Sequence, residues 1–235
     1  MTVSLHVWGD YACFTRPELK AERVSYEVMT PSAARGILTA IYWKPEFRWV
    51  VERIHVLNPI RFTQIRRNEL GCRMVTPGTD VMKGEKAANL GVYIEDNRQQ
   101  RAATILRDVS YIIDAHVDVL HPEPGVDSLK KHIEMFKRRA SKGQCFHQPC
   151  MGVREFPAMF ALVSDEHPAP PCELPENQLN RHLGLMLHDL VYKDDPKGEV
   201  ICAHTKKHQT ATPHFFMAEL ANGVVHVPSL SQTLS

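Results

Sequence analysis

Histidine is the side chain of this sequence best suited to acid–base chemistry near neutral pH. The chain has 13 histidines in 235 residues, and the ordinary histidine pKa, about 6.5, lies close to working pH. His116 is the leading candidate, because its segment alternates and places it among polar neighbours on one face of a predicted strand. A histidine that is only hydrogen-bonded at the surface would fit the same pattern.

Two further candidates follow the first predicted helix. Tyr42 stands at the end of that helix, where it could handle a proton or serve as a half-buried aromatic anchor. Lys44 follows two residues later and could reach a phosphate or be solvated. Cleavage of RNA needs only such groups, because the 2′-hydroxyl is an internal nucleophile held beside the phosphate. The products would be a 2′,3′-cyclic phosphate and a 5′-hydroxyl.

Positive charge gathers locally although the net charge is only +1, from 28 Lys and Arg against 27 Asp and Glu. A helix predicted over 128–139 and a strand predicted over 60–68 carry the basic residues that could contact phosphates. These candidates are Lys130, Lys131, Lys137, Arg138, Arg139, Arg66 and Arg67. A solvated helix face would carry similar charge.

Several familiar catalytic patterns are absent from the sequence. It contains no GxxxxGK[ST] phosphate loop, no GxSxG elbow and no HExxH motif. Its acidic residues form no obvious cluster for two-metal nuclease chemistry. Cys145, His147 and Cys150 stand close together, but no second pair has zinc-site spacing, so ordinary thiols in an ordered loop are expected. We therefore expect no cofactor.

The elements that must position these residues follow the order strand, helix, strand, strand, helix, strand. Thr30 and Pro31 mark the start of the first helix, which must end near Trp43 because Lys44 precedes a proline. The strands and helices are expected at Val3–Trp8, Thr30–Trp43, Phe47–Leu57, Ile60–Asn68, Ala102–Val119, Ser128–Arg139 and Met151–Val163, with Phe47–Leu57 and Ile60–Asn68 joined tightly at Asn58-Pro59. The order predicts an α+β, ferredoxin-like βαββαβ (RRM-like) domain, with both helices on one face of the sheet.

Smaller elements complete the prediction. A short strand is expected at Ser25–Met29 and an exposed, mobile loop at Leu70–Leu90. The proline-rich segment Glu166–Pro175 predicts a linker. Strands beyond it are expected at Leu183–Tyr192, Val200–His204, His214–Leu220 and Val224–Pro228, with a turn at Asn222-Gly223. They predict a small antiparallel sheet, which divides the chain into residues 1–165 and 166–235.

Four segments carry a resemblance to a known family. They are YEVMTPSAARGILTAIYWKPEFRW at 26–49, PIRFTQIRR at 59–67, QCFHQPCMGVREFP at 144–157 and FFMAELANGVVHVP at 215–228. With them the chain closely resembles the type I-C (Dvulg) members of the Cas5 family, within the RAMP superfamily. The resemblance implies a ferredoxin-like domain with a C-terminal β extension. It also implies a metal-independent endoribonuclease that cuts CRISPR precursor RNA (pre-crRNA) at the base of the repeat hairpin.

The family's proposed catalytic set is a tyrosine after the first helix and a lysine–histidine pair on a later strand. The resemblance assigns Tyr42 to the tyrosine and His116 to the histidine. The paired lysine is missing there, since Ala115 precedes His116. Lys44 could replace it in space.

The resemblance also implies partners. After cutting, the protein would stay bound to the 5′ handle of the mature crRNA and join the other subunits of a type I-C effector complex. A non-catalytic subunit that only holds the handle is the main alternative. A metal-dependent DNA nuclease, or a protein that also binds DNA, is a second one. No apolar run is long enough for a membrane helix, and we expect a cytoplasmic protein.

Overall fold

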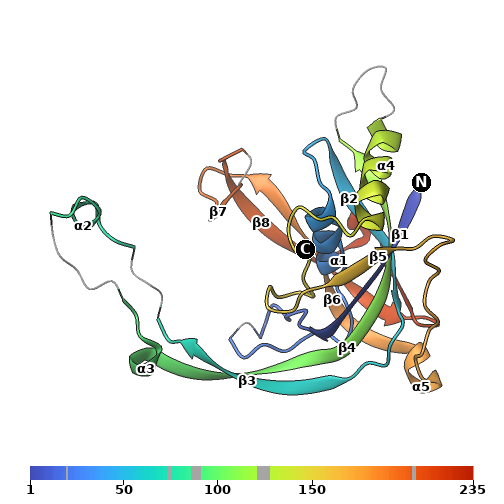
Figure 1. Ribbon diagram of the computed structural model, residues 1–235, viewed down its shortest axis with the longest axis horizontal. Helices are drawn as coiled ribbons and strands as arrows, with labels where there is room; N and C mark the ends of the chain where they lie inside the picture. Colours follow the sequence, from blue (N-terminus) through green and yellow to red (C-terminus); the bar gives the residue numbers. More distant parts are fainter. Residues whose placement is uncertain (20, 73–75, 86–90, 121–127, 203–204, 235) are drawn as a thin grey trace.

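The computed structural model shows an α+β chain with mostly antiparallel sheets and two substantial helices (Figure 1). It describes all residues except 20, 73–75, 86–90, 121–127, 203–204 and 235. None of the described helices has the length and apolar character needed to cross a membrane.

The main sheet has the strand order β5-β1-β4-β2-β9, and every neighbouring pair is antiparallel. Its strands are β1 (Thr2–Ala12), β2 (Phe47–Val56), β4 (Arg98–Val119), β5 (Met159–Leu162) and β9 (Val224–His226). Alternate residues of β4 face the core, as predicted: Tyr111, Ile113, Ala115 and Val117 are all buried. The longest strand, β4, therefore lies in the middle of the sheet, between β1 and β2.

Strand β4 changes partners along its 22 residues. Its first part pairs with β3 (Phe62–Leu70), and its second part pairs with β1 and β2. Asp108, with a φ of 52°, lies between the residues that pair with β3 and those that pair with β2. Strands β3 and β4 project as an arm that carries the short helices α2 (Thr79–Met82) and α3 (Ile94–Asn97) (Figure 1). The consecutive strands β2 and β3 therefore do not pair with each other.

Helices α1 (Pro31–Ile41) and α4 (Ser128–Ser141) pack on one face of the main sheet. The N-cap of α1 is Thr30, whose hydroxyl accepts a hydrogen bond from the Ala33 amide at 3.2 Å. Its apolar stripe, Ala34, Ile37, Leu38 and Ile41, is buried. On α4, Ile133 and Phe136 are buried, as predicted.

A second sheet has the order β6-β8-β7, with β6 (Arg181–Asp194), β7 (Val200–Ile201) and β8 (His208–Leu220). The small antiparallel sheet predicted for this part of the chain is therefore present. The helix α5 (Glu176–Leu179) precedes it and the 3-10 helix η1 (Leu230–Gln232) follows it. Asn222 and Gly223 form the predicted turn with φ values of 51° and 76°. After this turn, β9 leaves the second sheet and joins β2 of the main sheet.

Two predicted strands are wrong in part. Residues 25–29 contribute only an isolated bridge, between Ser25 and Thr15. In the stretch 151–163 only β5 is a strand, and turns precede it. Gly152 explains this, because its φ of 86° breaks an extended path. The predicted mobile loop at 70–90 contains helix α2, and part of it lies outside the described residues.

Candidate active site

Tyr42 lies at the C-cap of α1, in an extended conformation that turns the chain toward β2. Its ring stacks on Phe47 with centroids 5.6 Å apart, and its carbonyl accepts a hydrogen bond from the Trp49 indole at 2.9 Å. Its hydroxyl lies 3.0 Å from Nδ1 of His132, on α4. Both side chains are buried, with 4% and 2% of their surface exposed. The packing of α1 and α4 thus creates a tyrosine–histidine pair from residues 90 positions apart.

The His132 ring links this hydroxyl to a carboxylate. Its Nε2 lies 3.5 Å from Oε2 of Glu46, which follows Tyr42 by four residues. Its ring also packs on Phe47, with centroids 4.7 Å apart. If Nε2 carries the proton that faces Glu46, Nδ1 can accept a proton from the Tyr42 hydroxyl. The three side chains therefore form a short chain of groups able to move a proton.

The surroundings of Tyr42 hold its hydroxyl in the protonated form. Burial raises the pKa of Tyr42, the nearby Glu46 carboxylate raises it further, and the Arg139 guanidinium opposes both. That guanidinium lies 5.2 Å from the centroid of the Tyr42 ring. Tyr42 is consequently a proton donor at neutral pH rather than a phenolate base.

Two lysines border the pair. Lys131 directly precedes His132 on α4 and is exposed. Lys44 is exposed in the turn between Tyr42 and Glu46. The site therefore has one buried proton-handling pair and positive charge at its surface, which suits chemistry on a phosphodiester.

His116 lies on the other face of the main sheet. It is opposite Val50 of β2, so the two side chains share a face, whereas the next residue, Trp49, points toward α4 and packs on Phe136. Its Nδ1 lies 2.6 Å from Oε1 of Glu52. The structure therefore does not bring the sequence-predicted pair, Tyr42 and His116, together.

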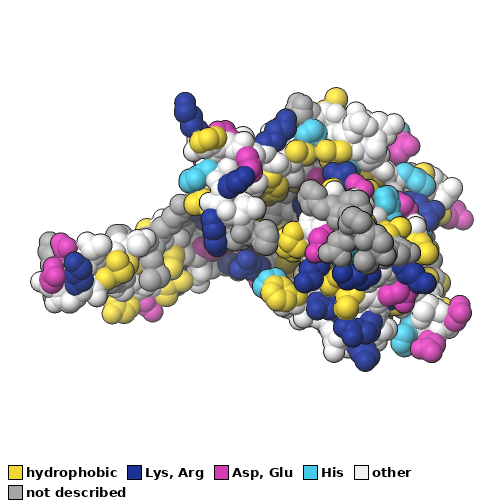
Figure 2. Space-filling view, turned by 90° about the horizontal axis from the view of Figure 1, so that it is seen from above, with side chains coloured by type: hydrophobic (Ala, Val, Ile, Leu, Met, Phe, Trp, Pro, Cys, Tyr) yellow, Lys and Arg dark blue, Asp and Glu magenta, His cyan; other side chains and the backbone are white. Residues whose placement is uncertain are grey.

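The basic residues proposed for RNA lie in two places. Four of these residues on α4 are exposed: Lys130, Lys131, Lys137 and Arg138. Arg139 is partly buried and donates a hydrogen bond to the Ile41 carbonyl at 3.2 Å. On the arm, Arg66 is exposed and Arg67 is paired with Glu155 at 2.9 Å. Figure 2, seen from the α4 end, shows Lys and Arg side chains gathered over the body of the molecule, among hydrophobic and acidic ones.

Comparison with known proteins decides the family. A model of the CRISPR-associated Cas5d family matches residues 2–228. The chain belongs to the Cas5d family. It is 57% identical over 228 residues to the CRISPR pre-crRNA endoribonuclease Cas5d of Mannheimia succiniciproducens, covering 96% of this chain and 94% of that one. It is 44% identical over 231 residues to the Cas5d protein of the same description from Thermus thermophilus, covering 97% and 91%.

Solved structures share the fold. An uncharacterised Streptococcus mutans protein, SMU1763c, matches with a TM-score of 0.65 and 22% identity, covering 100% of this chain and 96% of that one. A CRISPR-associated protein matches with a TM-score of 0.64 and 24% identity, covering 99% and 94%.

His132, which the structure places 3.0 Å from the Tyr42 hydroxyl, is a histidine that the sequence analysis did not single out. The resemblance implied a tyrosine and a lysine–histidine pair, and the dipeptide Lys131–His132 fits that pair by residue type. It lies on a helix rather than on a strand, and the sequence analysis assigns a role to Lys131 alone, as a candidate contact to RNA phosphates. The adjacent lysine, which is missing before His116, was the signal that could have found it.

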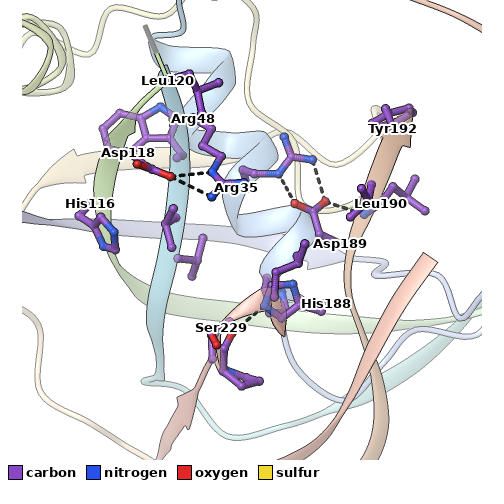
Figure 3. Close-up of a pocket in the computed structure, with 18 of the residues that line it drawn as sticks. Arg35, Arg48, His116, Asp118, Leu120, His188, Asp189, Leu190, Tyr192 and Ser229 are labelled. Carbon is purple, nitrogen blue, oxygen red and sulfur yellow. Dashed lines mark hydrogen bonds and ion pairs between the residues drawn. The ribbon is translucent and has the colours of Figure 1, made fainter. Parts of the chain in front are cut away.

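A cavity of about 800 Å³ lies between β2, α1 and β6 (Figure 3). His116 lines it, together with two ion pairs: Arg35 with Asp189 at 2.6 Å and Arg48 with Asp118 at 2.8 Å. Both cations are already neutralised, and the Tyr42 and His132 side chains are not among the lining residues. The cavity is therefore separate from the tyrosine–histidine pair.

Proposed function

We propose that this chain is an endoribonuclease that binds the CRISPR repeat hairpin and cuts pre-crRNA at the Tyr42–His132 pair. The observation that carries this proposal is the 3.0 Å contact between the Tyr42 hydroxyl and His132, which directly follows Lys131 in the sequence. The curated relatives, 57% and 44% identical, are both described as pre-crRNA endoribonucleases.

The reaction needs one proton acceptor and one proton donor. The 2′-oxygen attacks phosphorus and loses its proton, and the bond from phosphorus to the 5′-oxygen breaks as that oxygen gains one. We assign the donor role to Tyr42, because its raised pKa keeps the hydroxyl protonated. His132 is then the acceptor, and Lys131 with Lys44 stabilises the negative charge on phosphate. No step in this scheme requires a metal ion.

The burial of both groups has a consequence for binding. A phosphate reaches Tyr42 and His132 only after the packing around them moves aside, including the Glu46 side chain 3.5 Å from His132. Catalytic hydrogen bonds seen without substrate commonly rearrange when the substrate binds. We therefore expect RNA binding to open this site.

For the fold, we propose the ferredoxin-like arrangement. Its support is the antiparallel order β5-β1-β4-β2, with α1 connecting β1 to β2 and α4 connecting β4 to β5 on one face. Division into residues 1–165 and 166–235 stays a proposal. β9 complicates it, because this strand of the second part completes the main sheet.

We further propose that the protein keeps the 5′ handle of its product and works as a subunit of a type I-C effector complex. We also infer a cytoplasmic location, because the substrate RNA is transcribed there. The exposed basic residues of α4, Lys137 and Arg138 among them, support phosphate contacts to the repeat.

One assay tests the function against its alternatives. The purified protein is incubated in EDTA with its own repeat RNA and, in parallel, with RNA carrying a 2′-deoxy substitution at the cut site. Cleavage of the first and survival of the second are expected. Binding of both without cleavage would favour a non-catalytic subunit. Cleavage of DNA alone, and only with added divalent metal, would favour the DNA nuclease.

A further inference from the structure

Phe146 is an unusually exposed aromatic ring close to the Tyr42 site. Its side chain is 75% exposed, more than that of any other aromatic residue among the described exposed hydrophobic residues. It lies in the segment Gln144–His147, which the proposed reaction does not use. Single exposed apolar side chains are ordinary on protein surfaces, so it is the fixed placement of this ring that indicates a contact.

The backbone holds Phe146 in place. Gly143, at a φ of 63°, ends α4, and the Gln144 amide then donates a hydrogen bond to the Arg139 carbonyl at 2.9 Å. The amides of Phe146 and His147 both donate to the Ala40 carbonyl, at 2.8 and 3.1 Å. The segment is therefore anchored to the ends of both helices that build the active site.

The side chain of His147 also supports the Phe146 ring. The imidazole of His147 lies edge-on to Phe146, with centroids 4.5 Å apart and planes at 70°. This contact supports one part of the ring and leaves the remainder open to solvent. A flat, supported and accessible aromatic face suits a planar ligand such as a nucleobase.

The segment that holds Phe146 lies near the Tyr42 site, at a spacing that suits a few stacked RNA nucleotides. Ala40, which anchors Phe146, precedes Tyr42 by two residues, and Arg139 contacts both the Tyr42 ring and the segment. Along α4, His132 and Arg139 are about 10 Å apart at 1.5 Å per residue. That distance spans roughly three stacked nucleotides at a rise of about 3.4 Å.

The local charge favours RNA over a protein partner. From Met135 to Arg154 the sequence has five Lys and Arg and no Asp or Glu, although the whole chain is balanced at 28 to 27. Phe146 lies within this acid-free stretch. Base stacking beside phosphate contacts is the usual way in which proteins hold single-stranded RNA.

We propose that Phe146 stacks on a nucleobase of the repeat RNA within about three nucleotides of the cut, and so positions the scissile phosphate at Tyr42 and His132. Phe146 is a positioning residue and takes no part in proton transfer. This inference rests on the proposed function.

The test uses the full-length protein and uncleavable repeat RNA, with 2′-deoxy at the cut site. Each nucleotide within four of the cut is replaced in turn by fluorescent 2-aminopurine. Wild-type protein and Phe146→Trp are expected to quench the probe at one or two positions by stacking. Phe146→Ala and Phe146→Leu are expected to lose that quenching and to bind about tenfold more weakly. Met217→Ala, which removes another exposed apolar side chain, is the control and should match wild type.

The following outcomes decide the proposal. Because Phe146 is exposed, its variants should keep the wild-type melting temperature, so a lost signal reports contact with RNA. Wild-type affinity and quenching in Phe146→Ala would overturn the proposal, and so would Phe146→Leu behaving as wild type. Normal RNA binding combined with failure to assemble with other subunits would overturn it in favour of a protein contact. If the protein never cuts normal repeat RNA but still quenches the probe through Phe146, the stacking proposal holds and the nuclease proposal fails.

Discussion

The buried Tyr42 hydroxyl has two possible roles. It can donate a proton in catalysis, or it can make a hydrogen bond to His132 that only stabilises the fold. Replacing Tyr42 with Phe removes the hydroxyl and its 3.0 Å contact with His132, but keeps the ring stacked on Phe47. We expect cleavage of repeat RNA to slow by about 10²–10⁴-fold, the usual contribution of one acid–base group. RNA affinity should change less than about twofold. Single-turnover rates and binding isotherms on the same RNA check both values.

The Tyr42→Phe result separates catalysis from structure. A melting temperature close to that of wild type shows that the packing survived. Unchanged cleavage in a well-folded Tyr42→Phe protein would remove the hydroxyl from the mechanism.

Asp114 makes stability depend on pH at the acidic end. Burial would raise its pKa, but hydrogen bonds from His55 at 2.9 Å and Ser4 at 2.6 Å, with the charge of Arg53, outweigh burial and lower it. A lowered pKa means that Asp114 stabilises the fold above its unfolded pKa, about 3.9, and that this stability is lost as pH falls through the folded value.

The corresponding variant is Asp114→Asn. At pH 7 it should lower the free energy of unfolding by about 1–3 kcal/mol, because His55 and Arg53 lose their carboxylate. Its stability should also fall less steeply than that of wild type below about pH 4. Denaturant unfolding across pH 2.5–7 measures both effects. Parallel curves for the two proteins would show that Asp114 does not couple protonation to folding.

At the scale of elements, a single glycine controls how the chain enters β5. Gly152 has a φ of 86°, and a Cβ there would lie 2.1 Å from the Cys13 carbonyl oxygen, at the end of β1. We expect Gly152→Ala to destabilise the protein by at least about 3 kcal/mol. Gly143→Ala is the matched control, since Gly143 also has a positive φ but no atom within 4 Å of the added carbon. It should cost only about 1–2 kcal/mol. Equal losses would mean that the contact with Cys13 is relieved by a shift of the backbone.

Local chemistry explains why some elements were predictable. Thr30 and Pro31 specify the start of α1 through neighbouring atoms, and an alternation of apolar and polar residues, with Ile112 as its exception, specifies the second part of β4. The pairing of β4 with three different strands depends on the tertiary arrangement and leaves no local signal.

The site was predictable only in part for the same reason. Tyr42 was found from its sequence context, but its partner lies 90 residues away on a helix whose charge drew attention to phosphate binding. His116 had the better local pattern, on a polar strand face. The packing of α4 against α1, rather than the alternation of β4, decides which histidine meets the tyrosine.

At the scale of the whole molecule, affinity for RNA should come from a patch rather than from net charge. Replacing Lys137 and Arg138 together with Ala removes two exposed charges from α4. We expect weaker RNA binding and a decrease of roughly 1.4–1.8 in the slope of log affinity against log salt concentration. Lys193→Ala with Lys197→Ala, two exposed lysines near β7, is the control and should leave the slope unchanged. Equal effects of the two double variants would argue against a localised RNA surface.

The central claim, that Tyr42 works with His132, is tested most directly by comparing two histidine variants. His132→Ala and His116→Ala are each given uniformly labelled repeat RNA in EDTA, and single-turnover cleavage is followed beside wild type. The account predicts that His132→Ala loses at least about 10²-fold in rate, while His116→Ala stays within about threefold of wild type. The reverse order, with His116→Ala inactive and His132→Ala active, would contradict it.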